Sequence, residues 1–384
     1  MNAADAYLTL NLLPEIGSGR ANQLLRRLGD PVAILRASTR QLAETPGISP
    51  RLAEIIAGWR DHCDPEAEKR LAARAGVEIV CRDHAAYPEL LREIADPPLL
   101  LYLRGNLEAI SRLSRSLALV GTRGPTNYGA RVARHLAEAA VYDGWSVVSG
   151  LARGIDTVAH RAAVEADGCT VAVLGGGLAQ IYPPENRELA REICRQGLLI
   201  SELPMRMKPT RLTFPMRNRL IAGLSQGTVV VEAGTRSGAL ITANLAMEQN
   251  RRVFAVPGQV DSPQSRGCHS LLKDGAVLVE RFEDIAVEFS FGQPFPGIAQ
   301  TAKPTERQMA EVADAATAPP PPPAAASLSE LESRLLELLG RDEMQIDDLI
   351  AQSGEPAHLV LATLIQLEMR HLVEQMPGKR VALR

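Results

Sequence analysis

The chain has 384 residues, 46% of them hydrophobic and 4% aromatic, with a formal net charge of −3 and a pI near 6.2. This length suggests two or three domains with aliphatic cores, and the acidic balance excludes a protein held on nucleic acid by its overall charge. The five cysteines form no C-x-x-C pair, so we expect no zinc site, no disulfide framework and a cytoplasmic location. A signal peptide and a membrane-spanning run are also absent from the sequence pattern.

Residues 1–65 are predicted to form a small domain of short helices. Ile16-Gly17-Ser18-Gly19, followed by a helical run, has the pattern of a helix-hairpin-helix unit, and Pro46-Gly47-Ile48-Ser49 is a weaker second copy. Glycines at such turns let backbone amides approach a phosphate. The alternative is a plain helix-turn-helix with glycine as a C-cap, which we favour because the second copy lacks the Gly-x-Gly spacing.

Residues 75–290 alternate between apolar runs and helical patterns. Strands are expected at 116–121, 145–150, 169–175, 198–203, 228–232 and 252–257, with 77–81 and 99–103 before them, and helices at 129–142, 156–166, 184–196, 216–224 and 239–249. Nearly continuous apolar strands joined by helices predict an α/β fold: a Rossmann-like, mostly parallel sheet with helices on both faces.

Two further segments complete the chain. Residues 291–327 are rich in proline and alanine and are predicted to be a linker, partly polyproline II. Residues 328–384 show three helical patterns, at 331–339, 346–351 and 358–367, and then a short hairpin around Pro377-Gly378-Lys379, which together indicate a winged helix. That domain has six Lys/Arg against ten Asp/Glu, a net of −4, so we expect it to contact a protein or to be structural.

Small and polar residues follow the predicted strands where ligands bind to an open α/β sheet. The strand ends are Gly121-Thr122-Arg123-Gly124, Ser149 to Gly154, Gly175-Gly176-Gly177 and Glu232-Ala233-Gly234-Thr235. Glycine permits close backbone approach, and the following helices offer amides to an anion. Any one of these glycines could simply form a tight turn, but four such ends on one sheet predict a phosphate-binding surface.

The segment from Arg206 to Arg219 sets one aromatic ring, Phe214, among cations without any Asp or Glu. Its cations are Arg206, Lys208, Arg211, Arg217 and Arg219. A ring that stacks on a base, flanked by groups that hold phosphates, is suited to single-stranded nucleic acid. The alternative is a solvated basic loop with one buried phenylalanine.

Signals for catalysis are weak. The glycines miss the G-x-G-x-x-G spacing, and no P-loop, H-E-x-x-H or G-x-S-x-G motif occurs. Asp156 and His160, four apart on a predicted helix, could form an acid–base pair, but we favour Asp156 as a helix cap and a structural His160. Glu232 could assist glycosidic cleavage, but we favour a carboxylate that accepts hydrogen bonds from loop amides. We therefore predict no catalytic residue, metal or cofactor.

Residues 121–129, 149–160 and 214–225 resemble the DNA-processing protein family DprA, also called Smf. The similarity extends over 171–177 with Tyr182-Pro183, 230–243 and 253–258, and so covers the middle domain. The flanking regions are similar to the family's N-terminal SAM-like helical domain and C-terminal winged helix.

This resemblance implies a non-enzymatic recombination mediator. Such a protein binds single-stranded DNA, protects incoming DNA, forms a homodimer through the Rossmann-like domain and loads RecA recombinase in natural transformation. Gly267-Cys268-His269 departs from the Gly-Thr-Asn of many members, in a segment similar to the family's self-association and recombinase-contact region, so individual interface residues are not assigned.

The Arg of the family's Gly-Thr-Arg motif falls on Arg123, and its Phe-Pro-x-Arg-Asn-Arg run falls on Phe214, Arg217, Asn218 and Arg219. The predicted DNA-binding residues are Gly121, Thr122, Arg123, Gly150, Arg153, Gly175, Gly177, Lys208, Arg211, Phe214, Arg217, Asn218, Arg219 and Glu232.

Two alternative functions remain open. One is a nucleotide-sugar hydrolase of the lysine-decarboxylase-like Rossmann group, although residues 231–238 lack that group's paired glycines and later Glu. The other is a nucleotide-sensing regulator that acts through its end domains.

Overall fold

The computed structural model describes residues 1–290 and, near the C-terminus, residues 330–339, 344–355, 359–360, 363–364, 367, 372–376 and 380–383. The chain divides into two compact units, Met1–Phe295 and Pro296–Arg384, and each is described by itself. The predicted linker at 291–327 lies outside the described residues.

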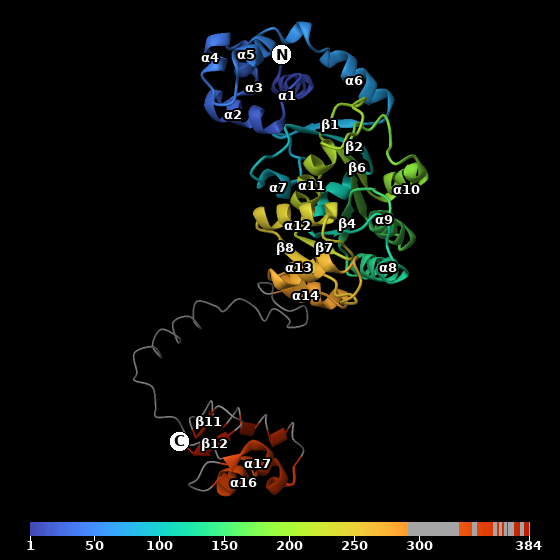
Figure 1. Cartoon of the computed structure of the whole chain (residues 1–384). Coiled ribbons are helices and arrows are strands. Elements are labelled where there is room, and N and C mark those ends of the chain that lie inside the picture. The colour runs from blue at the N-terminus through green and yellow to red at the C-terminus, as the bar shows by residue number, and fades with distance from the viewer. Residues whose placement is uncertain are drawn as a thin grey trace, which may run out of the picture. The chain divides into compact units, whose positions relative to one another are not determined.

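The N-terminal region is a cluster of short helices (Figure 1). Its helices are α1 (Ala3–Leu12), α2 (Ser18–Leu28), α3 (Pro31–Arg36), α4 (Thr39–Ala43), α5 (Pro50–Ala57) and α6 (Pro65–Arg74), with a 3₁₀ turn at Trp59–Asp61. Gly17 is the N-cap of α2, and Ser49 caps α5 by accepting a hydrogen bond from the Leu52 amide. The expectation that glycine ends a helix here is therefore wrong at Gly17, which starts one, whereas Gly29 ends α2 with a positive φ.

A nine-stranded sheet forms the centre of the first unit, with the strand order β1-β2-β6-β5-β4-β3-β7-β8-β9. The strands are β1 (Glu78–Cys81), β2 (Leu100–Gly105), β3 (Ser116–Val120), β4 (Ser146–Ser149), β5 (Thr170–Val173), β6 (Leu198–Ser201), β7 (Gly227–Val230), β8 (Arg252–Ala255) and β9 (Val277–Leu278). All neighbours from β6 to β9 are parallel, and β2 pairs antiparallel with both β1 and β6. The predicted mostly parallel sheet is confirmed.

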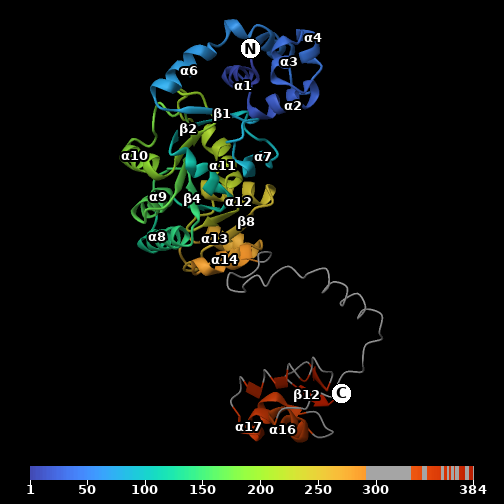
Figure 2. The same ribbon diagram turned by 180° about the vertical axis from the view of Figure 1, so that it is seen from behind.

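Helices cover both faces of this sheet (Figures 1 and 2). One face carries α8 (Asn127–Tyr142), α9 (Ile155–Glu165), α10 (Arg187–Gln196) and α14 (Phe282–Ser290), and the other carries α7 (Glu89–Arg92), α11 (Thr213–Gly223), α12 (Gly238–Glu248) and α13 (Arg266–Lys273). Short 3₁₀ segments lie at Leu107–Ser114 and Pro184–Asn186. The chain proceeds from β3 outward to β6 and then returns to β7 on the other side of β3. The crevice between β3 and β7 is therefore the topological switch point.

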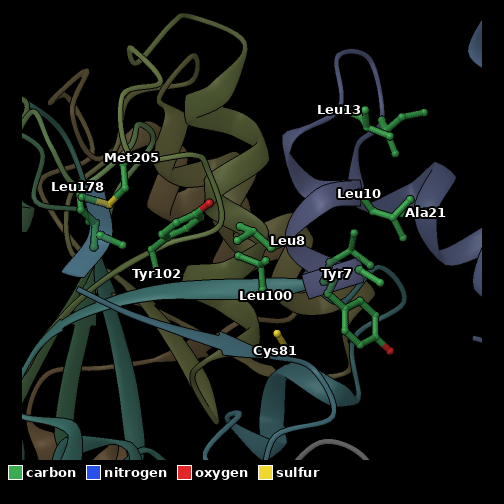
Figure 3. Packing of buried hydrophobic residues seen from close by; sticks show 14 of the residues in the cluster. Tyr7, Leu8, Leu10, Leu13, Ala21, Cys81, Leu100, Tyr102, Leu178 and Met205 are labelled. Carbon is green, nitrogen blue, oxygen red and sulfur yellow. The ribbon is translucent and has the colours of Figure 1, made fainter. Parts of the chain in front are cut away.

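The helical region and the sheet share one hydrophobic core. Figure 3 shows Leu8 of α1 close to Leu100 and Tyr102 of β2, with Leu178 and Met205 beyond them. Residues 1–65 and 75–290, predicted as separate domains, thus belong to one compact unit.

The second unit has winged-helix elements. They are α16 (Glu330–Leu339), β10 (Met344–Gln345), α17 (Ile346–Ser353), β11 (Val373–Met376) and β12 (Arg380–Leu383), with the antiparallel strand order β10-β12-β11. The described residues of the helix predicted at 358–367 are helical, and the turn Pro377-Gly378-Lys379 lies outside the described residues. In neither unit does the described part of the chain contain a helix long and apolar enough to cross a membrane.

Candidate nucleic-acid interface

A groove of about 900 Å³ runs along the carboxyl ends of the parallel strands. It lies at the switch point, where the loops after β3 and β7 diverge and where α11 and α12 begin. We call it the strand-end groove. Its lining includes Thr122, Arg123, Ala152, Tyr182, Arg211, Phe214, Pro215, Gly234, Thr235, Arg236, Ser237, Gly238 and Gln264.

Phe214 lies in the first turn of α11 and is half-buried. Its ring packs against Gly175, where an added Cβ would lie 2.8 Å from Phe214 Cδ1. The Tyr182 ring centroid is 5.9 Å away with an interplanar angle of 41°, and the Arg123 guanidinium carbon lies 5.6 Å from the Phe214 centroid. Two aromatic rings and a cation therefore form a platform of the kind on which a nucleobase stacks.

Several cations along the groove and the loop beside it are exposed. Arg123, Lys208 and Arg211, all in the predicted set, form no ion pair with a carboxylate in the described part of the chain. Arg206 and Arg236 share this property. Arg153 is exposed too, but its Nε donates to Glu185 Oε1, which offsets its charge.

Arg217 is predicted to bind DNA, and the structure places it, with Asn218, in the lining of the strand-end groove but almost entirely buried. It is 6% exposed, and its Nη1 donates to the carbonyl of Gly150, at 2.6 Å, and to that of Val173. Its Nε donates to Asn218 Oδ1 at 3.2 Å. Burial lowers its pKa to about 10, against the opposing effect of the Asp156 carboxylate. Arg217 thus braces the ends of β4 and β5.

Arg219 points away from the groove, toward the helical region. Its guanidinium pairs with Glu202 and donates to the Asp96 carbonyl at 2.6 Å and to Ser18 Oγ at 3.1 Å. Ser18 and Asn22 of α2 in turn donate to the Asp96 carboxylate. The anionic group beside the start of α2 is therefore the Asp96 carboxylate of the chain itself. It lies at the turn where the sequence pattern suggested that a phosphate could bind.

The four predicted glycines are required by internal packing. An added Cβ would lie 2.6 Å from Ile155 at Gly121, 2.6 Å from the Arg217 guanidinium at Gly150, 2.8 Å from Phe214 at Gly175 and 2.0 Å from the Pro204 carbonyl at Gly177. The absence of a side chain at Gly150 and Gly175 leaves room for Arg217 and Phe214. Direct contact between the four glycines and DNA stays a prediction.

Two buried carboxylates accept hydrogen bonds from loop groups near the strand ends. Glu232, 4% exposed, accepts hydrogen bonds from the Thr126 amide and hydroxyl, both at 2.9 Å, at the start of α8. Asp156 Oδ2 accepts from the amides of Gly150, at 3.1 Å, and Ala152, at 3.3 Å. Asp156 therefore holds the loop before its helix rather than capping the helix, and Glu232 takes the hydrogen-bonding role that we favoured. The amides of Thr126, Gly150 and Ala152 are therefore not available to a phosphate.

Asp156 and His160 have different partners. His160 Nδ1 lies 2.7 Å from Thr170 Oγ1, and burial lowers the pKa of the imidazole to about 3. Burial raises the pKa of Asp156, and the Arg217 charge opposes this shift. These contacts support a structural role for both residues. Among the residues that the structure describes, no group of three or more His, Cys, Asp or Glu side chains could hold a metal ion.

Sequence reasoning did not select Tyr182 and Arg236, which line the groove. Tyr182 is 47% exposed and lies well beyond the end of β5 at Val173. In the sequence it stands out only as part of the Tyr182-Pro183 motif. Arg236 lies in the loop after β7. Its position in the loop after a strand end, beside Thr235 and Ser237, is the feature of the sequence that could have indicated a ligand-binding residue.

Residues 78–290 match the family model for DNA recombination-mediator protein A, and residues 319–379 match the DprA winged helix domain. The chain belongs to the DNA recombination-mediator protein A family. Relatives within this family include Protein Smf of Synechocystis sp., 36% identical over 373 residues that cover 93% of this chain and 94% of the relative. DprA of Bacillus subtilis is 40% identical over 239 residues, which cover 62% of this chain and 76% of that protein.

Solved structures of the family agree with this fold. DprA of Streptococcus pneumoniae is 34% identical, with a TM-score of 0.63 over 75% of this chain and 98% of that one. DprA of Helicobacter pylori is 28% identical, with a TM-score of 0.50 over 55% of this chain and 95% of that one, and its structure concerns the single-stranded DNA binding mode of that protein. The predicted family is confirmed.

Proposed function

We propose that this chain is a recombination mediator that holds single-stranded DNA in the strand-end groove, protects incoming DNA and loads RecA recombinase in natural transformation. The observation that carries the proposal is the Phe214 ring, half-buried on the groove wall with Tyr182 and the Arg123 guanidinium beside it. The single-stranded DNA binding of the Helicobacter pylori relative supports it.

The chemistry of the groove suits a single strand better than a duplex. An aromatic ring stacks on any unpaired base, whereas the bases of a duplex are stacked on one another and hidden from it. Arg123, Arg211 and Arg236 supply exposed charges for the phosphates without reading base edges. Binding of this kind is tolerant of sequence, as a protein that handles arbitrary incoming DNA requires.

We propose that the role is not enzymatic. A backbone held by stacking and guanidiniums needs no general base, and the carboxylate that could have served a hydrolase, Glu232, is buried against Thr126. The proposed partners besides DNA are RecA and a second copy of the chain, bound through the Rossmann-like domain. Family membership supports both, and the interface residues stay unassigned.

The proposal predicts that the chain binds single strands more tightly than duplex and that this binding weakens with salt. Each phosphate neutralised contributes a slope of about 0.7 to the dependence of log affinity on log salt. Fluorescence anisotropy with matched single-stranded and duplex oligonucleotides, from low to high salt, measures both. Equal affinity for duplex, or affinity independent of salt, would contradict the proposal.

Two further assays separate the neighbouring functions. RecA filament formation on single-stranded DNA should be faster with the chain than without it. Incubation with labelled DNA, ATP and nucleoside monophosphates should yield no product, with or without divalent metal. Release of free base that Glu232→Gln abolishes would instead identify a hydrolase.

A further inference from the structure

The loop between β6 and α11 links the strand-end groove to a second hollow. It carries Arg206, Lys208 and Arg211, all exposed, and Arg211 already lines the groove. Five residue steps separate Arg206 from Arg211, so the loop extends the row of cations by at most about 18 Å.

Hydrogen bonds hold this loop in place. The Gly177 amide donates to the Met207 carbonyl at 2.8 Å, and the Ala179 amide donates to the Met205 carbonyl at 3.0 Å. On the other side, the Met205 amide donates to Glu68 Oε1 of α6 at 2.6 Å, and the Met205 side chain is fully buried. The cations of the loop are therefore presented from a backbone that is fixed to both the sheet and the helical region.

The second hollow, of about 460 Å³, is lined by α6, by the turn before it and, from this loop, by Arg206. We call it the α6 hollow. Its polar lining consists of His62, Asp64, Glu68, Arg70, Arg74 and Arg206.

Both carboxylates of the α6 hollow are already engaged. Glu68 accepts the Met205 amide, and Asp64 accepts the Ala67 amide at 2.9 Å as the N-cap of α6. Asp64 also approaches Arg70 at 3.8 Å, a loose contact between side chains that are both more than 60% exposed. Arg74 and Arg206 have no carboxylate partner within the described residues. The lining thus holds three arginines against two carboxylates, an excess of one positive charge, and Arg74 and Arg206 are exposed.

We propose that a single strand leaving the strand-end groove follows this loop and places phosphates against Arg206, Arg74 and Arg70. The α6 hollow is then a second backbone-binding site, and the helical region contributes directly to DNA binding. This extension rests on the proposed function of the groove. Binding to both sites requires a strand long enough to pass Lys208. A long oligonucleotide can therefore occupy the strand-end groove and the α6 hollow together, whereas a short one mainly occupies the groove.

The test compares oligothymidines of about 6 and about 20 nucleotides, the shorter within the site size of a single binding surface. The variant Arg70→Ala/Arg74→Ala/Arg206→Ala should bind the longer strand about tenfold more weakly at low salt, with a log–log salt slope smaller by about 2, because three cations are removed. Its affinity for the shorter strand should fall by much less, because a strand of that length can keep most of its phosphates on the cations of the strand-end groove and engages the α6 hollow only with its end.

A matched control removes three exposed arginines elsewhere: Arg36→Ala/Arg40→Ala/Arg195→Ala, on α3, α4 and α10. It should bind both lengths like the unchanged chain, and thermal melting should show both triple variants folded. The extension is overturned if the α6-hollow variant matches this control with the longer strand, or if it weakens both lengths equally. If the unchanged chain fails to bind either length, the proposed function itself fails.

Discussion

Phe214 packs against Gly175 and also lines the strand-end groove. If a base stacks there, Phe214→Ala should lose about 1–3 kcal/mol of DNA binding. The ring is only half-buried, so the free energy of unfolding should fall by less than the about 3–5 kcal/mol that removing a core phenylalanine costs. Binding curves beside thermal melts measure the two effects.

Two companion variants sharpen this test. Phe214→Trp keeps a stacking face and should retain most of the affinity. Tyr142→Ala removes an aromatic ring that is 79% exposed at the far end of α8, and it should leave DNA binding unchanged. A large loss of stability in Phe214→Ala, with binding lost only in proportion to the unfolded fraction, would show that the ring is structural.

The sequence indicates which groove residues lie beside one another when they are close along the chain, but it does not show which cations bind to distant parts of the fold. Phe214, Lys208 and Arg211 lie in a segment without acids, so their place beside one another was visible in the chain. By contrast, Arg217 bonds to a residue 67 positions away, and Arg219 to one 123 positions away. The residues next to Arg217 and Arg219 in the chain do not indicate that these two guanidiniums donate hydrogen bonds within the folded protein.

Among the elements, α11 connects the binding surface to the rest of the molecule. It presents Phe214 to the groove, inserts Arg217 beneath the ends of β4 and β5, and points Arg219 toward the helical region. One rigid helix therefore fixes the position of the stacking ring relative to both the sheet and α2.

Replacement by methionine should mainly lower stability at the buried Arg217 of α11 and mainly weaken DNA binding at the exposed Arg123 after β3. Arg217→Met leaves the Gly150 and Val173 carbonyls without their donor and Asp156 without a nearby cation, so it should cost about 3–5 kcal/mol of stability. Arg123→Met should leave stability nearly unchanged and weaken single-strand binding. Urea denaturation and anisotropy on both variants measure the contrast.

Arg217→Lys is the conservative control, because a single ammonium keeps the charge but not the geometry of the guanidinium. Its loss of stability should lie between those of Arg217→Met and Arg123→Met. Equal stability losses in Arg217→Met and Arg123→Met would show that the interior placement of Arg217 does not matter to the fold.

The alternation of strands and helices was predictable because strands buried on both faces are nearly continuous apolar runs. The predicted strand at 169–175 corresponds to β5, Thr170–Val173, and the predicted helix at 239–249 to α12, Gly238–Glu248. Strand order was not predictable in the same way. The antiparallel pairing of β2 with β6 joins residues about a hundred positions apart, and β2 also packs against α1 and α10, contacts that the local pattern does not contain.

At the scale of the whole molecule, the second compact unit should be dispensable for DNA binding. A chain that ends at Phe295 keeps the first unit and loses the region 328–384, whose net charge is −4. Its affinity for single-stranded DNA should stay the same or rise slightly, because an acidic domain repels phosphates. Anisotropy on the truncated and full chains decides this, and a clear loss of affinity in the truncated one would assign the winged helix a role in binding DNA.

The carboxylates of Glu232 and Asp156 accept hydrogen bonds from loop amides near the strand ends, so those amides are not available to a phosphate, which has a consequence for selectivity in a cell. A free nucleotide carries few phosphates, and we expect it to engage only one or two of the exposed cations at a time. A polymer engages many at once, and each attached phosphate raises the effective concentration of the next. If the strand-end groove binds DNA as proposed, we therefore expect free nucleotides to compete only weakly with a connected strand.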